Sequence, residues 1–305
     1  MMPGLERHYG FMGSGDDYAA ASLVILGAPM DFTVSFRPGA RFGPEEIRRV
    51  SVGLEEYSPA LNRELSECRF YDAGDVELPP GGVEESLRRI GRAVEEIFAD
   101  GKFPLLLGGE HLVTLPAVQA AFRHHPELAV IHFDAHADLR DEYLGERLSH
   151  ATVMRRVLET VGWDNLYQFG IRSGTGEEFD LARKRSGLFF AEILPCLRDV
   201  CRQLRGRPIY ITLDIDVLDP AFAPGTGTPE PGGCSPRDVF NALYMLRELP
   251  VVGMDLVEVC PACDPTERTA LLAAKLVREA VLSFCPPCAF GGGERACGRK
   301  NFTAE

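Results

Sequence analysis

Residues 131–139, Ile-His-Phe-Asp-Ala-His-Ala-Asp-Leu, place Asp134, His136 and Asp138 at every second position of an apolar stretch. Alternate residues of a β-strand point to the same face, so two carboxylates and an imidazole would lie together. Ionised carboxylates are rarely buried side by side without a compensating charge. The stretch therefore predicts a positively charged partner, and a bound metal ion would supply one.

Two further segments supply residues of the same kind. Gly108-Gly-Glu-His111 ends in a histidine, and Leu213-Asp-Ile-Asp216 holds two carboxylates two residues apart. Taken singly, a buried histidine is more often a hydrogen-bonded core residue, and an aspartate at a strand end more often caps a loop or helix. Taken together, four acids and two histidines at three neighbouring strand ends have no basic residue in their segments before Arg140.

We therefore predict a binuclear metal site. Its six ligands are His111, Asp134, His136, Asp138, Asp214 and Asp216, and two of them, Asp134 and Asp214, could bridge the ions. Two divalent cations would offset the four carboxylates, and together they could hold a hydroxide that acts as a nucleophile near neutral pH. Mixed carboxylate and imidazole donors favour manganese and leave iron, cobalt, nickel and zinc open. His132, on the same strand face as Asp134, is predicted to be a non-ligand that contributes to stability.

Seven apolar runs are the predicted strands that position these residues. They are Ser22–Pro29, Arg69–Asp72, Phe103–Leu107, Leu128–Asp134, Asn165–Ile171, Arg207–Asp214 and Val251–Glu258. Between the second and third runs, apolar side chains in residues 83–97 recur at the three- and four-residue spacing of a helix. This alternation predicts an α/β fold with a parallel sheet covered on both faces, doubly wound rather than barrel-shaped. Chemistry in such folds lies at the carboxyl ends of the strands.

Capping residues predict two helix starts. Ser235-Pro236 and Asp264-Pro265 are each typical of an N-cap followed by a first-turn proline, with Asp238 or Glu267 three residues after the cap. Before the first of these helices, residues 219–234 contain four prolines and four glycines without periodicity. A long loop of this kind inside a compact domain is usually functional.

Composition limits the partners and the location of the chain. Its 305 residues are 45% hydrophobic and 25% charged, which is typical of a soluble globular protein, and we expect one domain over residues 1–305. A net charge of −13 argues against binding to nucleic acid or to an anionic membrane. Nine cysteines are an odd number in a long chain, which favours a reducing cytoplasm over a disulfide framework.

Four cysteines form two C-x-x-C pairs, Cys260 with Cys263 and Cys285 with Cys288. The spacing superficially resembles a zinc ribbon, but a helix of about five turns between the pairs would hold them roughly 25–30 Å apart. We therefore do not expect a shared zinc ion. Cys297 adds a third cysteine to the C-terminal tail, residues 285–305, which could bind a metal or form a disulfide by itself.

Five segments resemble signature blocks of the ureohydrolase family, which comprises arginase, agmatinase and their relatives. They are GGEH at 108–111, FDAHADLR at 133–140, LSHAT at 148–152, LDIDVLDPAFAPGTGTPEPGG at 213–233 and DLVEVCP at 255–261. With GAPMDFTVSFRPGARFGP at 27–44, the resemblance spans nearly the whole chain and is closest to bacterial agmatinases. The chain departs from the family pattern at Glu110, where aspartate is frequent, and at Thr212, where serine is common.

The resemblance implies a three-layer α/β/α sandwich with a central, mostly parallel sheet, as in arginase, and two Mn²⁺ ions per chain. One ion would be held by His111, Asp134, Asp138 and Asp214, and the other by Asp134, His136, Asp214 and Asp216. Glu258 matches the carboxylate that grips the substrate guanidinium, and His150 matches a proton-transfer histidine. Asp138 would move a proton from the nucleophile to the leaving amine. A homo-oligomer, trimer or hexamer, is also implied.

The implied reaction is hydrolysis of a small cationic guanidino substrate, and we expect agmatine to give putrescine and urea. The loop 139–147 resembles the agmatinase version, and its acids Asp141, Glu142 and Glu146 could favour a terminally cationic substrate, or could simply be solvated. Guanidinobutyrate, guanidinopropionate and arginine remain open as substrates. A histone-deacetylase-like zinc amidohydrolase and a non-catalytic paralogue are the rivals from other classes, and the retention of all six ligands and Glu258 argues against both.

Overall fold

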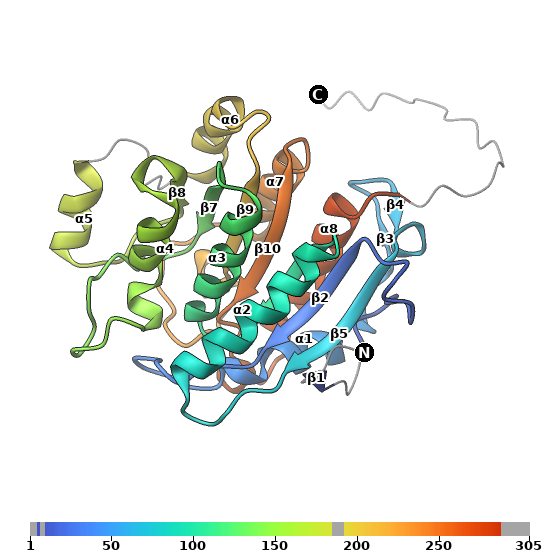
Figure 1. The fold of residues 1–305 in the computed structure, drawn as a ribbon, viewed down its shortest axis with the longest axis horizontal. Coiled ribbons are helices and arrows are strands. Elements are labelled where there is room, and N and C mark those ends of the chain that lie inside the picture. Colours follow the sequence, from blue (N-terminus) through green and yellow to red (C-terminus); the bar gives the residue numbers. More distant parts are fainter. Residues whose placement is uncertain (1–4, 7–9, 185–191, 288–305) are drawn as a thin grey trace.

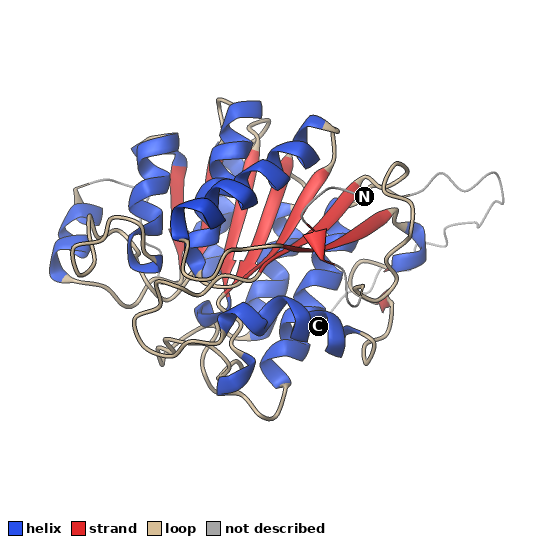
Figure 2. Ribbon diagram, turned by 60° about the horizontal axis from the view of Figure 1, so that its bottom comes forward, coloured by secondary structure: helices blue, strands red, loops and turns tan. Residues whose placement is uncertain are grey.

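The structure is a computed structural model, and it describes residues 5–6, 10–184 and 192–287. Its described residues build an eight-stranded sheet with helices on both faces (Figures 1 and 2). Seven strands are parallel, in the order β5 (Phe70–Val76), β2 (Leu23–Ala28), β6 (Phe103–Gly108), β10 (Val251–Val257), β9 (Ile209–Asp214), β7 (Ala129–Phe133) and β8 (Leu166–Phe169). The short β1 (Leu5–Glu6) adds to β5 in the antiparallel sense, and β3 (Tyr57–Ser58) and β4 (Arg63–Glu64) form a separate pair.

The helices lie in two layers because successive strand residues point to opposite faces. One face packs against α1 (Gly43–Ser51), α6 (Ile193–Gln203), α7 (Pro236–Leu246) and α8 (Arg268–Phe284). The other packs against α2 (Val83–Ala99), α3 (Thr114–His124), α4 (Val153–Val161) and α5 (Gly176–Arg183). The predicted α/β/α sandwich, the seven predicted strands and the helix over 83–97 are confirmed.

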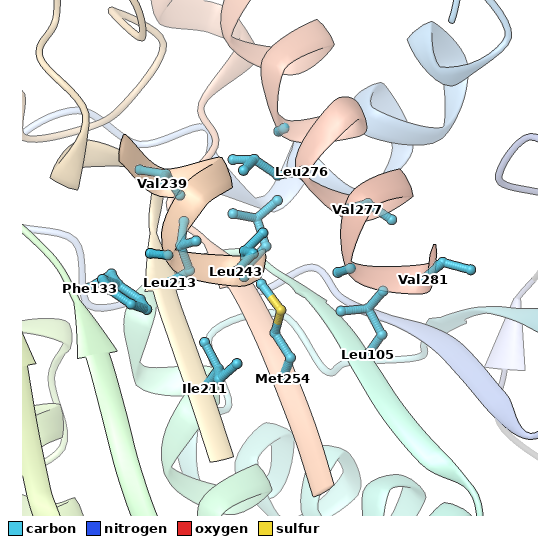
Figure 3. Close-up of a cluster of buried hydrophobic side chains, with 14 of the residues drawn as sticks. Leu105, Phe133, Ile211, Leu213, Val239, Leu243, Met254, Leu276, Val277 and Val281 are labelled. Carbon is cyan, nitrogen blue, oxygen red and sulfur yellow. The ribbon is translucent and has the colours of Figure 1, made fainter. Parts of the chain in front are cut away.

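The first of these faces forms a continuous apolar core (Figure 3). Ile211 and Met254 project from neighbouring strands toward Leu243 of α7 and Val277 of α8, and all four side chains are buried. Each such side chain stabilises the fold by about 1.5–3 kcal/mol through removal of apolar surface from water. The strands are thus fixed along their length, which holds their carboxyl ends in place.

The two predicted helix starts have different outcomes. Helix α7 begins at Pro236, and Ser235 and Asp238 form the predicted reciprocal capping box. Helix α8 begins at Arg268, so its predicted start after Asp264 is wrong by three residues. The carboxylate of Asp264 instead accepts bonds from Thr266 and Thr269, and the turn that they close puts Glu267 in the left-handed conformation with φ 61°.

The loop 219–234 is held by main-chain contacts rather than by regular secondary structure. The guanidinium of Arg172 donates to the carbonyl oxygens of Glu230 at 2.6 Å and Asp216 at 2.7 Å, and further to four others nearby. The carboxylate of Asp219 accepts N–H groups from both ends of the loop. One cation and one anion therefore fix the path of a segment that has no periodicity.

Helix α8 separates Cys260 and Cys263 from Cys285, as the sequence predicts for these three cysteines. Cys260 and Cys263 precede the helix, and Cys285 follows it beside Ser22, with Sγ and Oγ 3.3 Å apart. The predictions for Cys288 and Cys297 fall outside the described residues. Within the described ranges, none of the helices is long and apolar enough to cross a membrane.

Candidate metal centre

The candidate site lies where the carboxyl ends of four strands meet. β6 leads to His111, β7 leads to Asp134, β9 ends in Asp214, and β10 leads to Glu258. The expectation of three neighbouring strands is wrong in one respect, because β10 lies between β6 and β9. The strand that separates them thus brings Glu258 to the same edge as the predicted ligands.

Main-chain N–H groups orient three of the carboxylates. The Oδ1 atom of Asp134 accepts the N–H of His136 at 2.5 Å. The Oδ1 atom of Asp214 accepts the N–H of Asp216 at 2.8 Å, and that of Asp216 accepts the N–H of Ala135 at 3.0 Å. In each carboxylate the second oxygen, Oδ2, lies beside a histidine ring nitrogen. The backbone after each strand therefore aims one oxygen of each acid into the site.

His111 is surrounded by three of these acids. Its Nδ1 atom lies 3.0 Å from Asp134 Oδ2, 3.2 Å from Asp138 Oδ2 and 3.4 Å from Asp214 Oδ2. Its other ring nitrogen, Nε2, is 3.0 Å from the hydroxyl of Thr212. The four residues predicted to hold one ion are therefore gathered around a single imidazole nitrogen.

The residues predicted to hold the other ion are adjacent. His136 Nδ1 lies 2.8 Å from Asp216 Oδ2 and 3.6 Å from Asp134 Oδ1. Asp134 belongs to both groups, and Asp214 is joined to Asp216 by the main-chain bond given above. The structure thus brings all six predicted residues into one cluster, while their division between two ions stays a prediction.

The donor set fits metal ions. His111 Nδ1 and Asp216 Oδ2 are buried without a hydrogen-bond partner, and within the described part of the chain no lysine or arginine pairs with the four carboxylates. Burial and the charge of Asp134 raise the pKa of Asp138 to about 7, and burial with neighbouring acids raises the pKa of Asp214 well above its usual range. Divalent cations would satisfy the orphaned atoms and offset the charge that causes these shifts.

His132 supports the cluster from behind. The amide nitrogen of Gln168 donates to the carbonyl oxygen of Ala137 at 2.8 Å, which fixes the orientation of the amide, and the same nitrogen lies 2.9 Å from His132 Nδ1. Nδ1 is therefore an acceptor, and the neutral ring carries its proton on Nε2, which donates to Asp134 Oδ2 at 2.8 Å. Burial lowers the pKa of His132, which favours this neutral form. Both ring nitrogens are engaged, which supports the prediction of a non-ligand.

Glu258 and His150 lie beside one another, with Oε1 and Nδ1 3.8 Å apart. Glu258 has a left-handed backbone with φ 63°, its Oε1 accepts the N–H of His111 at 2.8 Å, and burial raises its pKa to about 8. The N–H of Ser35 donates to His150 Nε2 at 3.1 Å, so the neutral ring carries its proton on Nδ1, on the side of Glu258. Burial lowers the pKa of His150 to about 4, and the ring is therefore neutral at physiological pH.

Glu110, the departure from the family pattern, supports His150 indirectly. Its Oε2 accepts the N–H and the hydroxyl of Thr33, both at 2.8 Å, and Thr33 Oγ1 accepts the N–H of His150 at 3.0 Å. Burial raises the pKa of Glu110 to about 7. The longer side chain at this position thus reaches a neighbouring segment and stays away from the ligand cluster.

A cavity of about 260 Å³ opens onto the cluster. Four of the predicted residues line it, namely His136, Asp138, Asp214 and His150, whereas Glu258 lies next to His150 and is not among the described lining residues. A substrate in this cavity would meet both the candidate metal ligands and the His150 ring.

Comparison with known proteins agrees with this geometry. The sequence model of the Arginase family matches residues 21–283. The chain belongs to the arginase family. Agmatinase from Bacillus subtilis is 49% identical over 278 residues, which are 90% of this chain and 96% of that protein. Mitochondrial guanidino acid hydrolase from Homo sapiens is 40% identical and covers 83% of this chain and 76% of that protein. The solved structure of the agmatine ureohydrolase of Thermoplasma volcanium has a TM-score of 0.82 at 33% identity, over 92% of this chain and 95% of that one.

Membership of the arginase family confirms the resemblance predicted from the signature blocks, and the cavity adds residues that were not predicted. Ser35, Arg140, Tyr143, Glu178 and Thr228 also line it. Three of these, Ser35, Arg140 and Thr228, lie inside segments that carry the family resemblance, which is a signal that could have identified them. Glu178 has no such signal, because it is brought in by the capping box at the start of α5.

The three loop acids that could favour a terminally cationic substrate, or could simply be solvated, do not line the cavity at the ligand cluster. Among the described residues that line the cavity, Asp141, Glu142 and Glu146 are absent. The carboxylate of Asp141 forms an ion pair with Arg156, and Glu142 is exposed and lines a separate cavity. That cavity shares Arg140 and Glu178 with the one at the ligand cluster, so an effect of these acids on substrate preference stays a prediction.

Proposed function

We propose that this chain hydrolyses agmatine to putrescine and urea with two Mn²⁺ ions bound by the six clustered residues. As a member of the arginase family, the chain is an enzyme of the ureohydrolase type. The observation that carries the proposal is the convergence of three carboxylates on His111 Nδ1 beside the second group around His136. Its agmatinase relative from Bacillus subtilis, 49% identical over 90% of this chain, supports agmatine as the substrate.

The proposed division of ligands follows the two groups. His111, Asp134, Asp138 and Asp214 would hold one ion, and Asp134, His136, Asp214 and Asp216 the other. When bound, the ions supply a hydroxide nucleophile near neutral pH and positive charge at the reacting centre. Main-chain bonds that fix one oxygen of each bridging carboxylate leave the second oxygen oriented before any ion binds.

Glu258 is proposed to bind the guanidinium of the substrate. A carboxylate matches a planar guanidinium through two parallel hydrogen bonds. The bond from the His111 N–H and the left-handed backbone hold the carboxylate of Glu258 in one orientation. A buried carboxylate with a raised pKa gains the most from a cationic partner, because the partner removes the cost of its burial.

Two residues are proposed to move protons. Asp138 lies at the boundary between the ligand cluster and the cavity, and it can take a proton from the nucleophile and pass it to the leaving amine. His150 is neutral with its proton on Nδ1, so this N–H can donate a hydrogen bond toward the substrate, and the ring must take up a second proton before it can transfer one to the amine. A histidine with an ordinary pKa would instead be a mixture of the neutral and the protonated ring near neutral pH.

A guanidino acid such as guanidinobutyrate is the second candidate substrate. Arg140 lines the cavity, and its guanidinium would attract a carboxylate at the distal end of a substrate. The buried Glu178 lies 3.8 Å from Arg140 Nε and offsets much of that charge, which favours agmatine over the acid.

Urea release from agmatine, guanidinobutyrate, guanidinopropionate and arginine with added Mn²⁺ tests the proposal. We expect the highest kcat/KM for agmatine. A higher value for guanidinobutyrate would refute agmatine while keeping the ureohydrolase class. Metal analysis separates the rival from another class, because a histone-deacetylase-like enzyme would hold a single zinc ion rather than two manganese ions.

The remaining parts of the proposal concern assembly and location. We propose a homo-oligomer, trimer or hexamer, in the cytoplasm, with one domain over residues 1–305. The family resemblance supports the oligomer, and the odd number of cysteines supports a reducing compartment. Sedimentation of the purified chain tests the oligomer directly.

A further inference from the structure

Cys260 and Cys263 form a C-x-x-C motif that the proposed reaction does not use. Both are thiols; Cys260 is the N-cap of the 3₁₀ helix Pro261–Cys263 that follows β10, and Cys263 is its last residue. Their Sγ atoms lie 3.4 Å apart. A disulfide has a sulfur–sulfur distance of about 2.0 Å, so the two sulfurs need to approach by only about 1.4 Å.

The two thiols differ in accessibility. Cys260 is fully buried, and Cys263 is partly exposed. Burial, followed by the contact with Cys263, raises the pKa of Cys260 to about 12, which keeps this thiol protonated. A small oxidant therefore reaches Cys263 first, and the thiol of Cys260 lies in contact with Cys263 on its buried side.

We propose that Cys260 and Cys263 are a modification site at which hydrogen peroxide forms a reversible disulfide that slows turnover. The Cys263 thiolate attacks a peroxide oxygen, the O–O bond breaks, and hydroxide leaves and is protonated to water. The sulfur of Cys260 then attacks the resulting sulfenic acid, the S–S bond forms, and a second water leaves with the Cys260 proton. Two thiols are oxidised and one peroxide is reduced to two waters, and a dithiol reductant reverses the change.

Cys260 connects this motif to the two loops that reach the cavity. Its Sγ contacts the carbonyl oxygen of Pro38 at 3.6 Å, and its N–H donates to the carbonyl oxygen of Gly225 at 2.7 Å. Gly39 fits tightly against it, since a Cβ there would lie 2.9 Å from Cys260 Sγ. Movement of this sulfur toward Cys263 therefore removes a contact that supports the segment 31–39.

The segment 31–39 also holds His150. Thr33 accepts its N–H, and Ser35 donates to its ring. A displacement of about 1 Å at a distance from the chemistry can cost on the order of 100-fold in rate. The disulfide would act on His150 only through the segment 31–39, so we expect a smaller effect, a fall in kcat of about tenfold. Glu258 lies two residues before Cys260, so a shift of its carboxylate would also lower kcat.

The test uses the full-length, Mn²⁺-loaded protein treated with hydrogen peroxide. Peptide mapping without reductant should find Cys260 linked to Cys263, urea release should fall by about tenfold, and dithiothreitol should restore it. The variant Cys263→Ser should keep full activity before and after peroxide. Cys196→Ser, which removes a partly exposed thiol from α6, should respond as the wild type does.

Two results would overturn the proposal: peroxide-treated wild type without the linked peptide, or the linked peptide with unchanged urea release. If Cys263→Ser does not fold, the peptide map of the wild type and its recovery with dithiothreitol still test whether the disulfide forms and slows turnover. Only the activity measurement rests on the proposed function. A chain that releases no urea from any guanidino substrate before treatment refutes that function, whereas the linked peptide is read from its mass alone.

Discussion

Replacing Gly109 by alanine should disturb the metal centre through the backbone alone. A Cβ at this position would lie 2.0 Å from the carbonyl oxygen of Met30 and 2.7 Å from its nitrogen. Ordinary contact begins at 3.4 Å, so the two segments must separate by about 1.4 Å (3.4 − 2.0). Both obstacles are main-chain atoms, which cannot rotate out of the way as a side chain does.

The cost follows from the contacts that this separation breaks. The N–H of Glu110 donates to Met30 O at 2.7 Å, the N–H of Gly109 to Ala28 O at 2.9 Å, and the N–H of Glu258 to Gly109 O at 2.8 Å. Loss of two or three such bonds at about 1 kcal/mol each, with about 1–3 kcal/mol of overpacking strain, gives roughly 3–6 kcal/mol of lost stability. His111 lies two residues further on, so its ring should move out of the cluster.

Denaturant unfolding and metal analysis measure both consequences. We expect Gly109→Ala to lose roughly 3–6 kcal/mol of unfolding free energy and to bind much less of the proposed Mn²⁺ than the wild type. Gly176→Ala is the matched control, because a Cβ there meets nothing within 4 Å and the backbone is not left-handed. It should remain within about 0.5 kcal/mol of the wild type. A Gly109→Ala variant with unchanged stability and two bound ions would refute the reasoning.

Three other predictions concern individual side chains. Asp214→Asn should lose Mn²⁺ and urea release together, and turnover at the wild-type level would exclude its role as a ligand. His132→Leu should lower the unfolding free energy by about 1–3 kcal/mol, since Asp134 loses a buried donor, while the metal content per chain stays at the wild-type value. The pKa of His150 is lowered from 6.5 to about 4, so between these pH values the unfolded chain binds a proton at His150 and the folded chain does not. The stability that depends on the neutral His150 should be complete above pH 6.5, and it should be lost toward pH 4 by up to about 1.4 kcal/mol per pH unit. Denaturant unfolding at a series of pH values measures this dependence. The His150→Gln variant should lose less unfolding free energy between pH 6.5 and pH 4 than the wild type.

The strands and the ligand cluster could be predicted because their signals are local. Asp134, His136 and Asp138 follow an apolar run that is typical of a buried strand, and Asp214 and Asp216 repeat the pattern. The expected strand alternation is wrong, however, because β7 ends at Phe133 and Asp138 has a left-handed backbone with φ 53°, so the turn after the strand brings these side chains together. Apolar runs of four to eight residues, which are also local signals, predicted the parallel strands. The two-residue strands β1, β3 and β4 are too short to show any periodicity.

The other features depend on contacts between distant segments. The residues that form β10 do not indicate that this strand lies between β6 and β9, because strand order is set by packing across the whole sheet. The start of α8 was misplaced because Asp264 bonds to Thr269 beyond the first turn. Ser35 and Thr228 enter the cavity from loops, where no spacing rule indicates direction.

Arg172 gives the loop 219–234 an unusual tolerance to mutation. The guanidinium binds main-chain carbonyl oxygens, which every amino acid carries, so most loop side chains can be exchanged without loosening the loop. Gly233, Gly225 and Gly227 are exceptions, because a Cβ would lie 2.5 Å from the nitrogen of Asp219, 2.8 Å from Asp264 Cβ and 2.9 Å from Arg37 O, respectively. Asp219 is another, because its carboxylate binds N–H groups at both ends of the loop. Substitutions at the other loop positions can therefore alter what the loop presents to a substrate, provided that Arg172, Asp219 and the packed glycines are retained.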